Sequence, residues 1–352
     1  MTGCYSTEKE SGHYFQYNEQ TGIASLDPAF AKNQSIMWAV HQLYSTLVEV
    51  DSQLNIVPSV AKRWDISPDR TTYTFYLRND VFFHNDPCFS GSKGRRVTAS
   101  DVVYSLKRIT DEKVASPGAW IFDGKIDSID GFKAINDTTF QINLLRPYNP
   151  ILGILSMQYC SIVPHEAVEK YGSDFRRHAV GSGPFQFVAW EEGLSLIMKK
   201  HPRYFEKDEA DKQLPYLDGV KVSFYDSKAT EFLLFRQNKL SFINDIDASF
   251  KDEVLTKRGV LSKEWEGKVK LHTHPYLNIE YLGLMVDSTN PVLKGSPTRL
   301  KKVRQAINYG FDRRKLVLYL RNSLGIPAES GFVPAGLPSF DSTKVKGYYY
   351  DP

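Results

Sequence analysis

Residues 97–105 read VTASDVVYS, and this stretch marks the start of a helix. Thr98 and Asp101 have the spacing of a capping box, with Asp in the position that Glu usually holds. Val102 and Leu106 follow at helical spacing, which turns one apolar face toward a core. The stretch therefore predicts a capped, amphipathic helix that begins after Thr98.

Strands are predicted on both sides of this helix by apolar residues that alternate with polar ones. These apolar residues are Tyr73, Phe75 and Leu77 before the helix, and Phe140, Ile142 and Leu144 after it. Residues 185–190 and 194–199 flank a turn that contains Gly193 and predict a hairpin, and residues 276–286 predict an aromatic strand. Because these elements do not alternate as regular βαβ units, we expect a mixed α/β fold.

Composition narrows the classes of function. A chain of 352 residues is long enough for two or three domains. The net charge of +3 is too small to indicate nucleic acid or an anionic membrane surface as a partner. Aromatic residues make up 13% of the chain, which suits either the wall of an organic-ligand site or a large aromatic core.

Motifs of catalysis are missing from the sequence. Residues 181–183 read GSG, which does not complete the G-x-S-x-G nucleophile elbow, and no P-loop or dinucleotide-binding glycine motif occurs. His272 and His274 would share one face of a strand, and this arrangement permits metal binding. So isolated a pair more often faces solvent or forms hydrogen bonds. We therefore expect no enzyme, no cofactor and no metal.

The three cysteines have separate interpretations. Met1-Thr2-Gly3-Cys4 is followed by a polar stretch, which resembles the processed end of a bacterial lipoprotein, with Cys4 as the lipidated residue. A chance cysteine in a disordered terminus is the alternative. Cys88 and Cys160 would either pair in an oxidising compartment or remain buried, inert thiols. Their sequence positions do not decide between these two states.

Eight segments, taken in order, resemble the family 5 solute-binding proteins of ABC importers, the dipeptide- and oligopeptide-binding group. The segments are 25–29 (SLDPA), 43–49 (LYSTLVE), 57–64 (VPSVAKRW), 73–78 (YTFYLR), 83–84 (FH), 97–105 (VTASDVVYS), 181–185 (GSGPF) and 303–313 (VRQAINYGFDR). No single segment is decisive, but their order along the chain makes a joint signal.

The resemblance implies a periplasmic-binding-protein type II-like fold with two lobes and an extra small domain. Residues 12–50 and 181–270 would form lobe I, residues 51–180 the extra small domain, and residues 271–352 the start of lobe III. Residues 1–11 would be a tether. The chain ends on Asp351-Pro352, a pair typical of a helix start, so we expect a C-terminal truncation that leaves lobe III incomplete.

The resemblance also implies a function: the substrate-binding component of an ABC peptide importer. Such a protein would be a monomer in the periplasm or at the cell surface, would capture dipeptides or oligopeptides between its lobes and would deliver them to a membrane permease. Residues 275–281 (PYLNIEY) resemble a cleft-lining P-Y-L-x-x-x-Y segment of this group. The residues placed at the ligand in this way are Tyr276, Asn278, Tyr281, Asn18, Glu19, Ala24, Ser25 and Trp120.

Several alternatives stay open. The aromatic segment with Tyr276 and Tyr281 could simply pack in a core. The same scaffold could bind nickel, haem or an oligosaccharide, or serve as a peptide-signal receptor, since a fold does not determine its ligand. A peptidase is the least favoured hypothesis, because the sequence shows neither the motif of a catalytic nucleophile nor a set of metal ligands.

Overall fold

The computed structural model describes residues 12–127, 130–274, 276–287 and 289–352, and the chain divides into two compact units. The N-terminal unit extends to Asn244 and the C-terminal unit starts at Asp245. Cys4 and the predicted tether at residues 1–11 lie outside the described residues. Within those residues, no helix is both long and apolar enough to cross a membrane.

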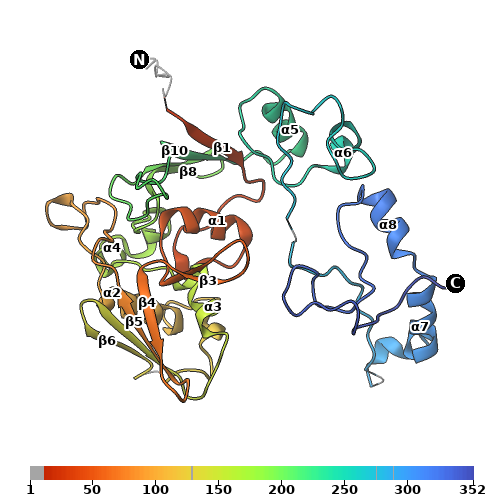
Figure 1. Ribbon diagram of the computed structural model, residues 1–352, viewed down its shortest axis with the longest axis horizontal. Coiled ribbons are helices and arrows are strands. Elements are labelled where there is room, and N and C mark those ends of the chain that lie inside the picture. Colours follow the sequence, from red (N-terminus) through yellow and green to blue (C-terminus); the bar gives the residue numbers. More distant parts are fainter. Residues whose placement is uncertain (1–11, 128–129, 275, 288) are drawn as a thin grey trace. The chain divides into compact units, whose positions relative to one another are not determined.

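The first sheet of the N-terminal unit has four strands in the order β1-β10-β9-β8. They are β1 (Tyr14–Asn18), β10 (Gly219–Ser223), β9 (Ser195–Lys200) and β8 (Phe185–Glu191). β1 runs parallel to β10, and the other neighbours are antiparallel. β8 and β9 form the predicted hairpin. Helix α1 (Gln34–Leu43) contacts β8 and helps to cover the sheet (Figure 1).

The second sheet is antiparallel throughout, in the order β4-β5-β7-β6. Its strands are β4 (Ala61–Ile66), β5 (Thr72–Leu77), β7 (Thr139–Asn143) and β6 (Phe132–Asn136). A separate small sheet pairs β2 (Val48–Val50) with β3 (Ile56–Pro58). Helix α2 (Ala99–Thr110) packs against β6 and β7 (Figure 1). The strands predicted around this helix are confirmed as β5 and β7.

The predicted start of α2 is also confirmed. Both reciprocal bonds of the capping box form between Thr98 and Asp101, and the backbone N–H of Thr98 donates to the Asp101 carboxylate at 2.8 Å. The helix buries Val102, Leu106 and Ile109 on one face. The local pattern around residues 97–105 was therefore sufficient to place this element.

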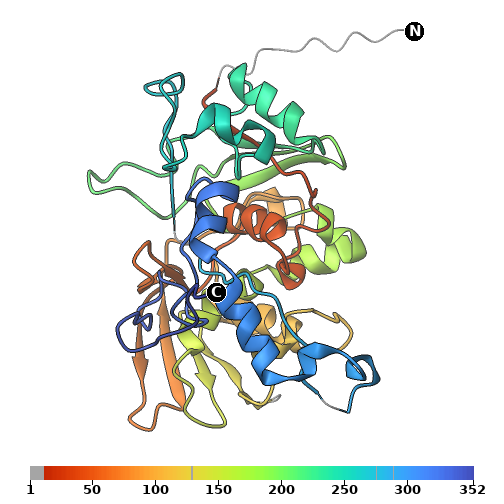
Figure 2. The ribbon, with the colours of Figure 1, turned by 90° about the vertical axis from the view of Figure 1, so that its right-hand side faces the viewer.

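The remaining elements are short. In the N-terminal unit they are η1 (Pro28–Phe30), η2 (Ser90–Ser92), η3 (Ala119–Ile121), α3 (Ile151–Leu155), η4 (Gln158–Cys160), α4 (His165–Tyr171), η5 (Gly172–Arg177) and α5 (Lys228–Arg236). In the C-terminal unit they are α6 (Ala248–Val254), η6 (Pro291–Leu293), η7 (Pro297–Arg299), α7 (Lys301–Gly310) and α8 (Arg313–Leu320). Figure 2 shows α7 and α8 following one another along the chain.

The strand predicted at residues 276–286 does not form. The described residues of this segment have no regular secondary structure. A strand needs a hydrogen-bonded neighbour, and no strand appears among the described residues of the C-terminal unit. The segment is rich in aromatic and apolar residues, but a strand that could pair with it is not among the described residues of this unit.

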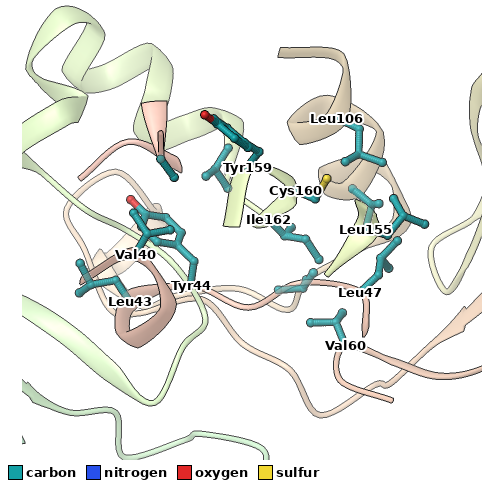
Figure 3. Packing of buried hydrophobic residues seen from close by; sticks show 14 of the residues in the cluster. Val40, Leu43, Tyr44, Leu47, Val60, Leu106, Leu155, Tyr159, Cys160 and Ile162 are labelled. Atoms are coloured by element: carbon teal, nitrogen blue, oxygen red, sulfur yellow. The ribbon is translucent and has the colours of Figure 1, made fainter. Parts of the chain in front are cut away.

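One continuous core joins both sheets of the N-terminal unit. From α1 and the residues after it, Val40, Leu43, Tyr44 and Leu47 pack into this core. Side chains from α2, from α3, from η4 and the residues just after it, and from the residues that follow β3 meet them there, as Figure 3 shows. These side chains are Val60, Leu106, Leu155, Tyr159, Cys160 and Ile162. The division of this unit into lobe I and an extra small domain remains a prediction.

Candidate ligand-binding site

A pocket of about 530 Å³ opens in the N-terminal unit, next to the SLDPA segment. It is bordered by the loop around η1, by the C-terminal end of α2 and by η5. The lining residues are Ala24, Ser25, Asp27, Phe30, Lys32, Ile36, Arg108, Lys113, Val114, Gly172, Ser173 and Arg176. The volume lies within the range of small-molecule sites.

Asp27 organises one wall of this pocket. Its Oδ1 accepts the backbone N–H of Ala29 at 3.0 Å, which caps η1. The same carboxylate accepts two hydrogen bonds from Arg108, at 3.0 and 2.8 Å, and the two side chains are only 7% and 12% exposed. A bidentate Arg–carboxylate pair of this kind fixes both distance and orientation. The pair therefore locks the loop that carries η1 onto α2.

The environment of Arg108 keeps its guanidinium charged. Burial by itself lowers the pKa of Arg108, but the hydrogen bonds and the charge of Asp27 outweigh burial and raise the pKa above its usual value. The guanidinium also lies 5.5 Å from the ring centre of Phe175, in η5. Arg108 thus connects all three segments that border the pocket.

Besides Arg108, the lining contains three further basic side chains, which are those of Arg176, Lys32 and Lys113. Arg176 pairs with Glu192 at 2.9 Å and donates to the carbonyl of Ala24 at 3.4 Å. Lys32 and Lys113 are exposed, and within the part of the chain that the structure describes their ammonium groups have no carboxylate partner. Asp27 is the one carboxylate in the described lining, and Arg108 already neutralises it. The pocket is therefore electropositive.

Two of the predicted site residues, Ala24 and Ser25, line this pocket. Ala24 is exposed, whereas Ser25 is buried and its Oγ accepts the backbone N–H of Asp27 at 3.0 Å. Ser25 therefore shapes the loop from within. The sequence analysis missed Lys32, Lys113 and Arg108, although the SLDPA segment next to Lys32 pointed to this region.

Asn18, Glu19 and Trp120 do not line the pocket. The buried side-chain amide of Asn18 donates to the carbonyl of Tyr225 at 2.9 Å and accepts the N–H of Tyr225 at 2.7 Å, so it brackets the ends of β1 and β10. Glu19 accepts a hydrogen bond from Thr21 at 2.9 Å. Trp120, on η3, is 62% exposed. A ligand contact of these three residues remains a prediction.

Tyr276, Asn278 and Tyr281 belong to the C-terminal unit, and all three are exposed. The ring of Tyr281 packs edge-on against Phe332, with the ring centres 5.3 Å apart. Neither tyrosine is buried in a core: their exposed fractions are 77% for Tyr276 and 70% for Tyr281. Their role at a ligand is likewise a prediction.

The possible disulfide between Cys88 and Cys160 does not form, and both thiols are free. Cys160 is buried, its Sγ donates to the carbonyl of Ile154 at 3.3 Å, and burial raises its pKa. For Cys88, burial and the hydrogen bond to Asp86 raise the pKa to about 12. Cys160 is thus a buried thiol, whereas Cys88 is only partly buried.

One group of side chains has the composition of a metal site. Atoms of Asp101, His165 and Glu166 lie within 4.8 Å of one another. However, the guanidinium of Arg95 donates to both carboxylates, at 2.7–2.8 Å for Asp101 and at 2.6–2.8 Å for Glu166. Both carboxylates are therefore already engaged by Arg95, and the group is a salt-bridge network that ties α2 to α4.

The chain belongs to the bacterial extracellular solute-binding proteins, family 5, whose middle region matches residues 55–352. It is 26% identical over 326 residues to the dipeptide-binding protein of Escherichia coli K12, covering 88% of this chain and 56% of that protein. It is also 26% identical over 332 residues to the glutathione-binding protein GsiB of Pectobacterium atrosepticum, covering 94% of this chain and 57% of that protein.

Solved structures confirm the fold class. The periplasmic binding protein DppA from Helicobacter pylori, in complex with the peptide STSA, superposes with a TM-score of 0.77 at 24% sequence identity. The match covers 98% of this chain and 65% of the DppA chain. The mixed α/β fold of type II periplasmic binding proteins is thus established. The chain spans a little more than half the length of the curated relatives that it matches.

Proposed function

We propose that the protein is the substrate-binding component of an ABC peptide importer. It captures dipeptides or oligopeptides and delivers them to permease subunits in the membrane. Family membership and relatives that are named for dipeptide and glutathione binding support this proposal. The observation that carries it is the pocket beside the SLDPA segment, because two residues expected at the ligand, Ala24 and Ser25, line it.

We also propose that the protein binds its ligand without chemical conversion. Ser182, the one serine in the elbow-like GSG segment, is completely buried and does not line the pocket beside η1. The carboxylates of Asp101 and Glu166 are both engaged in ion pairs with Arg95. Incubation with a peptide pool, followed by mass spectrometry, should return every peptide intact; shortened peptides would contradict this proposal.

The place of action follows from the family, whose members are described as bacterial extracellular proteins. We propose that this protein works as a monomer in the periplasm or at the cell surface, with a lipid on Cys4 as its anchor. Metabolic labelling with a fatty acid analogue tests the anchor. We expect the wild-type protein to be labelled and a Cys4→Ser variant to remain unlabelled. An unlabelled wild-type protein would contradict the lipid anchor.

Native mass spectrometry of the full-length protein, purified from its source without refolding, tests peptide capture. Co-purified peptides should appear as a series of masses above that of the protein, and acid release should yield fragments that can be sequenced. A single non-peptide mass, or a nickel or haem adduct, would show that the scaffold serves another ligand. Growth of a deletion strain on peptides as the sole nitrogen source separates uptake from signalling.

A further inference from the structure

The pocket beside η1 contains two lysines whose backbones are fixed and whose charges are unpaired. The N–H of Lys32 donates to the carbonyl of Phe30 at 2.7 Å, just after η1. The N–H of Lys113 donates to the side chain of Asp111 at 2.9 Å, just after α2. Both ammonium groups lack a carboxylate partner within the described ranges, and both residues line the same pocket.

The two lysine-bearing segments are held against each other by buried contacts. Asp27 and Arg108 form the bidentate ion pair described above. In addition, the buried hydroxyl of Ser116 donates to the carbonyl of Ala29 at 2.6 Å. These contacts fix the backbone segments that carry the two lysines, while the lysine ammonium groups remain without a carboxylate partner among the described residues. A site that is ordered in this way before binding loses less conformational freedom when a ligand binds to it.

The charge of the lining selects the chemistry of the ligand. Asp27 pairs with Arg108, and Arg176 shares Glu192 with Arg177, so among the described lining residues Lys32 and Lys113 are the basic groups without a carboxylate partner. Ammonium groups recognise carboxylates through charge-assisted hydrogen bonds, which are stronger than neutral ones. The apolar side chains of Phe30, Ile36 and Val114 border the same space and suit the aliphatic stem of such a ligand.

We propose that this pocket holds a carboxylate of the peptide ligand between Lys32 and Lys113. This inference rests on the proposed function, because it names the substrate class of that site. The carboxylate comes either from an acidic side chain or from the peptide's C-terminus, and the two sources share the same chemistry.

Isothermal titration of the full-length protein tests the inference with four probes: Ala-Glu-Ala, the isosteric Ala-Gln-Ala, Ala-Gln-Ala with an amidated C-terminus, and glutarate. Each probe is titrated into the wild type and into Lys32→Met and Lys113→Met variants. Lys62→Met is the matched control, because Lys62 is an exposed lysine on β4 outside the pocket. Both pocket lysines are exposed, so unfolding temperatures should be unchanged.

The expected result is that Ala-Glu-Ala binds about tenfold tighter than Ala-Gln-Ala, and that each pocket variant removes most of this preference. If instead amidation weakens binding and the pocket variants abolish that difference, the C-terminal carboxylate is the group held, which also supports the inference. Lys62→Met should behave like the wild type in either case.

Other outcomes separate this inference from the proposed function. Equal affinity for all three peptides in the wild type and both pocket variants would overturn the carboxylate site and leave peptide capture intact. Binding of glutarate alone, with loss in the pocket variants, would support the carboxylate site and overturn peptide capture. If none of the probes bound, both would be overturned.

Discussion

The carboxylate of Asp27 and the guanidinium of Arg108 form a buried, bidentate ion pair between residues that are 81 positions apart in the sequence. Asp27 belongs to the SLDPA segment, which precedes α1, and Arg108 lies in the last turn of α2. The pair thus joins the covering helix of the second sheet to the loop that leads into α1. It is the main electrostatic link at the candidate pocket.

An Asp27→Asn substitution should destabilise the N-terminal unit by about 3–5 kcal/mol, because it leaves the charge of Arg108 buried without a partner. Chemical denaturation followed by circular dichroism measures this loss. The Asp27→Asn/Arg108→Met double variant should cost less than the sum of the single variants. Arg63→Met, which breaks the exposed pair with Asp65, is the control and should change stability little. Additive losses would contradict a coupled pair.

Gly181 and Gly183 permit the chain to pass close to the end of α1. A Cβ atom at Gly181 would lie 2.1 Å from the carbonyl oxygen of Leu43, and one at Gly183 would lie 2.6 Å from the Leu43 carbonyl carbon. Gly181→Ala or Gly183→Ala should therefore cost about 1–3 kcal/mol of stability through overpacking. Gly153→Ala is the matched control, since nothing lies within 4 Å of its Cβ position. Equal melting temperatures for all three variants would disprove this close approach.

His84 and His201 form a buried edge-to-face pair, with ring centres 4.7 Å apart. Burial lowers the pKa of His84 to about 3 and that of His201 to about 4. In the unfolded chain these two histidines bind protons below about pH 6.5, whereas in the folded chain they stay neutral until the pH is much lower. Stability contributed by the neutral pair is therefore complete above that pH and declines as the pH falls toward 4.

The melting temperature, followed between pH 7 and about pH 4, tests this histidine pair. A His201→Gln variant should show a shallower decline, because one of the two buried groups no longer titrates. The exposed His13 provides the control, and His13→Gln should retain the wild-type slope. If His201→Gln and the wild type lost stability in parallel, acid sensitivity would have to originate elsewhere in the protein.

The two free thiols should resist alkylation in the native protein. Burial raises the pKa of Cys160, and burial together with Asp86 raises that of Cys88, so both are held as unreactive thiols at neutral pH. Iodoacetamide at neutral pH should leave Cys160 unmodified and label Cys88 slowly. In denaturant, both should react fully, which serves as the control. A cross-linked peptide joining Cys88 and Cys160 in a non-reducing digest would contradict the free thiols.

The elements that sequence patterns predicted correctly depend on local interactions. The capping box of Thr98 and Asp101 satisfies backbone groups within one turn, so its residues suffice to place the start of α2. Alternation in β5 and β7 and the turn between β8 and β9 are equally local. The prediction of a strand at residues 276–286 was wrong, because no strand that could pair with this segment forms among the described residues of the C-terminal unit.

The same contrast between local and long-range interactions applies to the candidate site. The sequence by itself determined the family, the mixed α/β class, the start of α2 and the region around Ala24 and Ser25, because these follow from residue order, side-chain period and caps. Only the tertiary structure decided that Asp27 pairs with Arg108, that Cys88 and Cys160 stay apart and that Lys32 and Lys113 share one pocket. Those relationships join residues that are dozens of positions apart, and packing of the core, not local preference, brings them together.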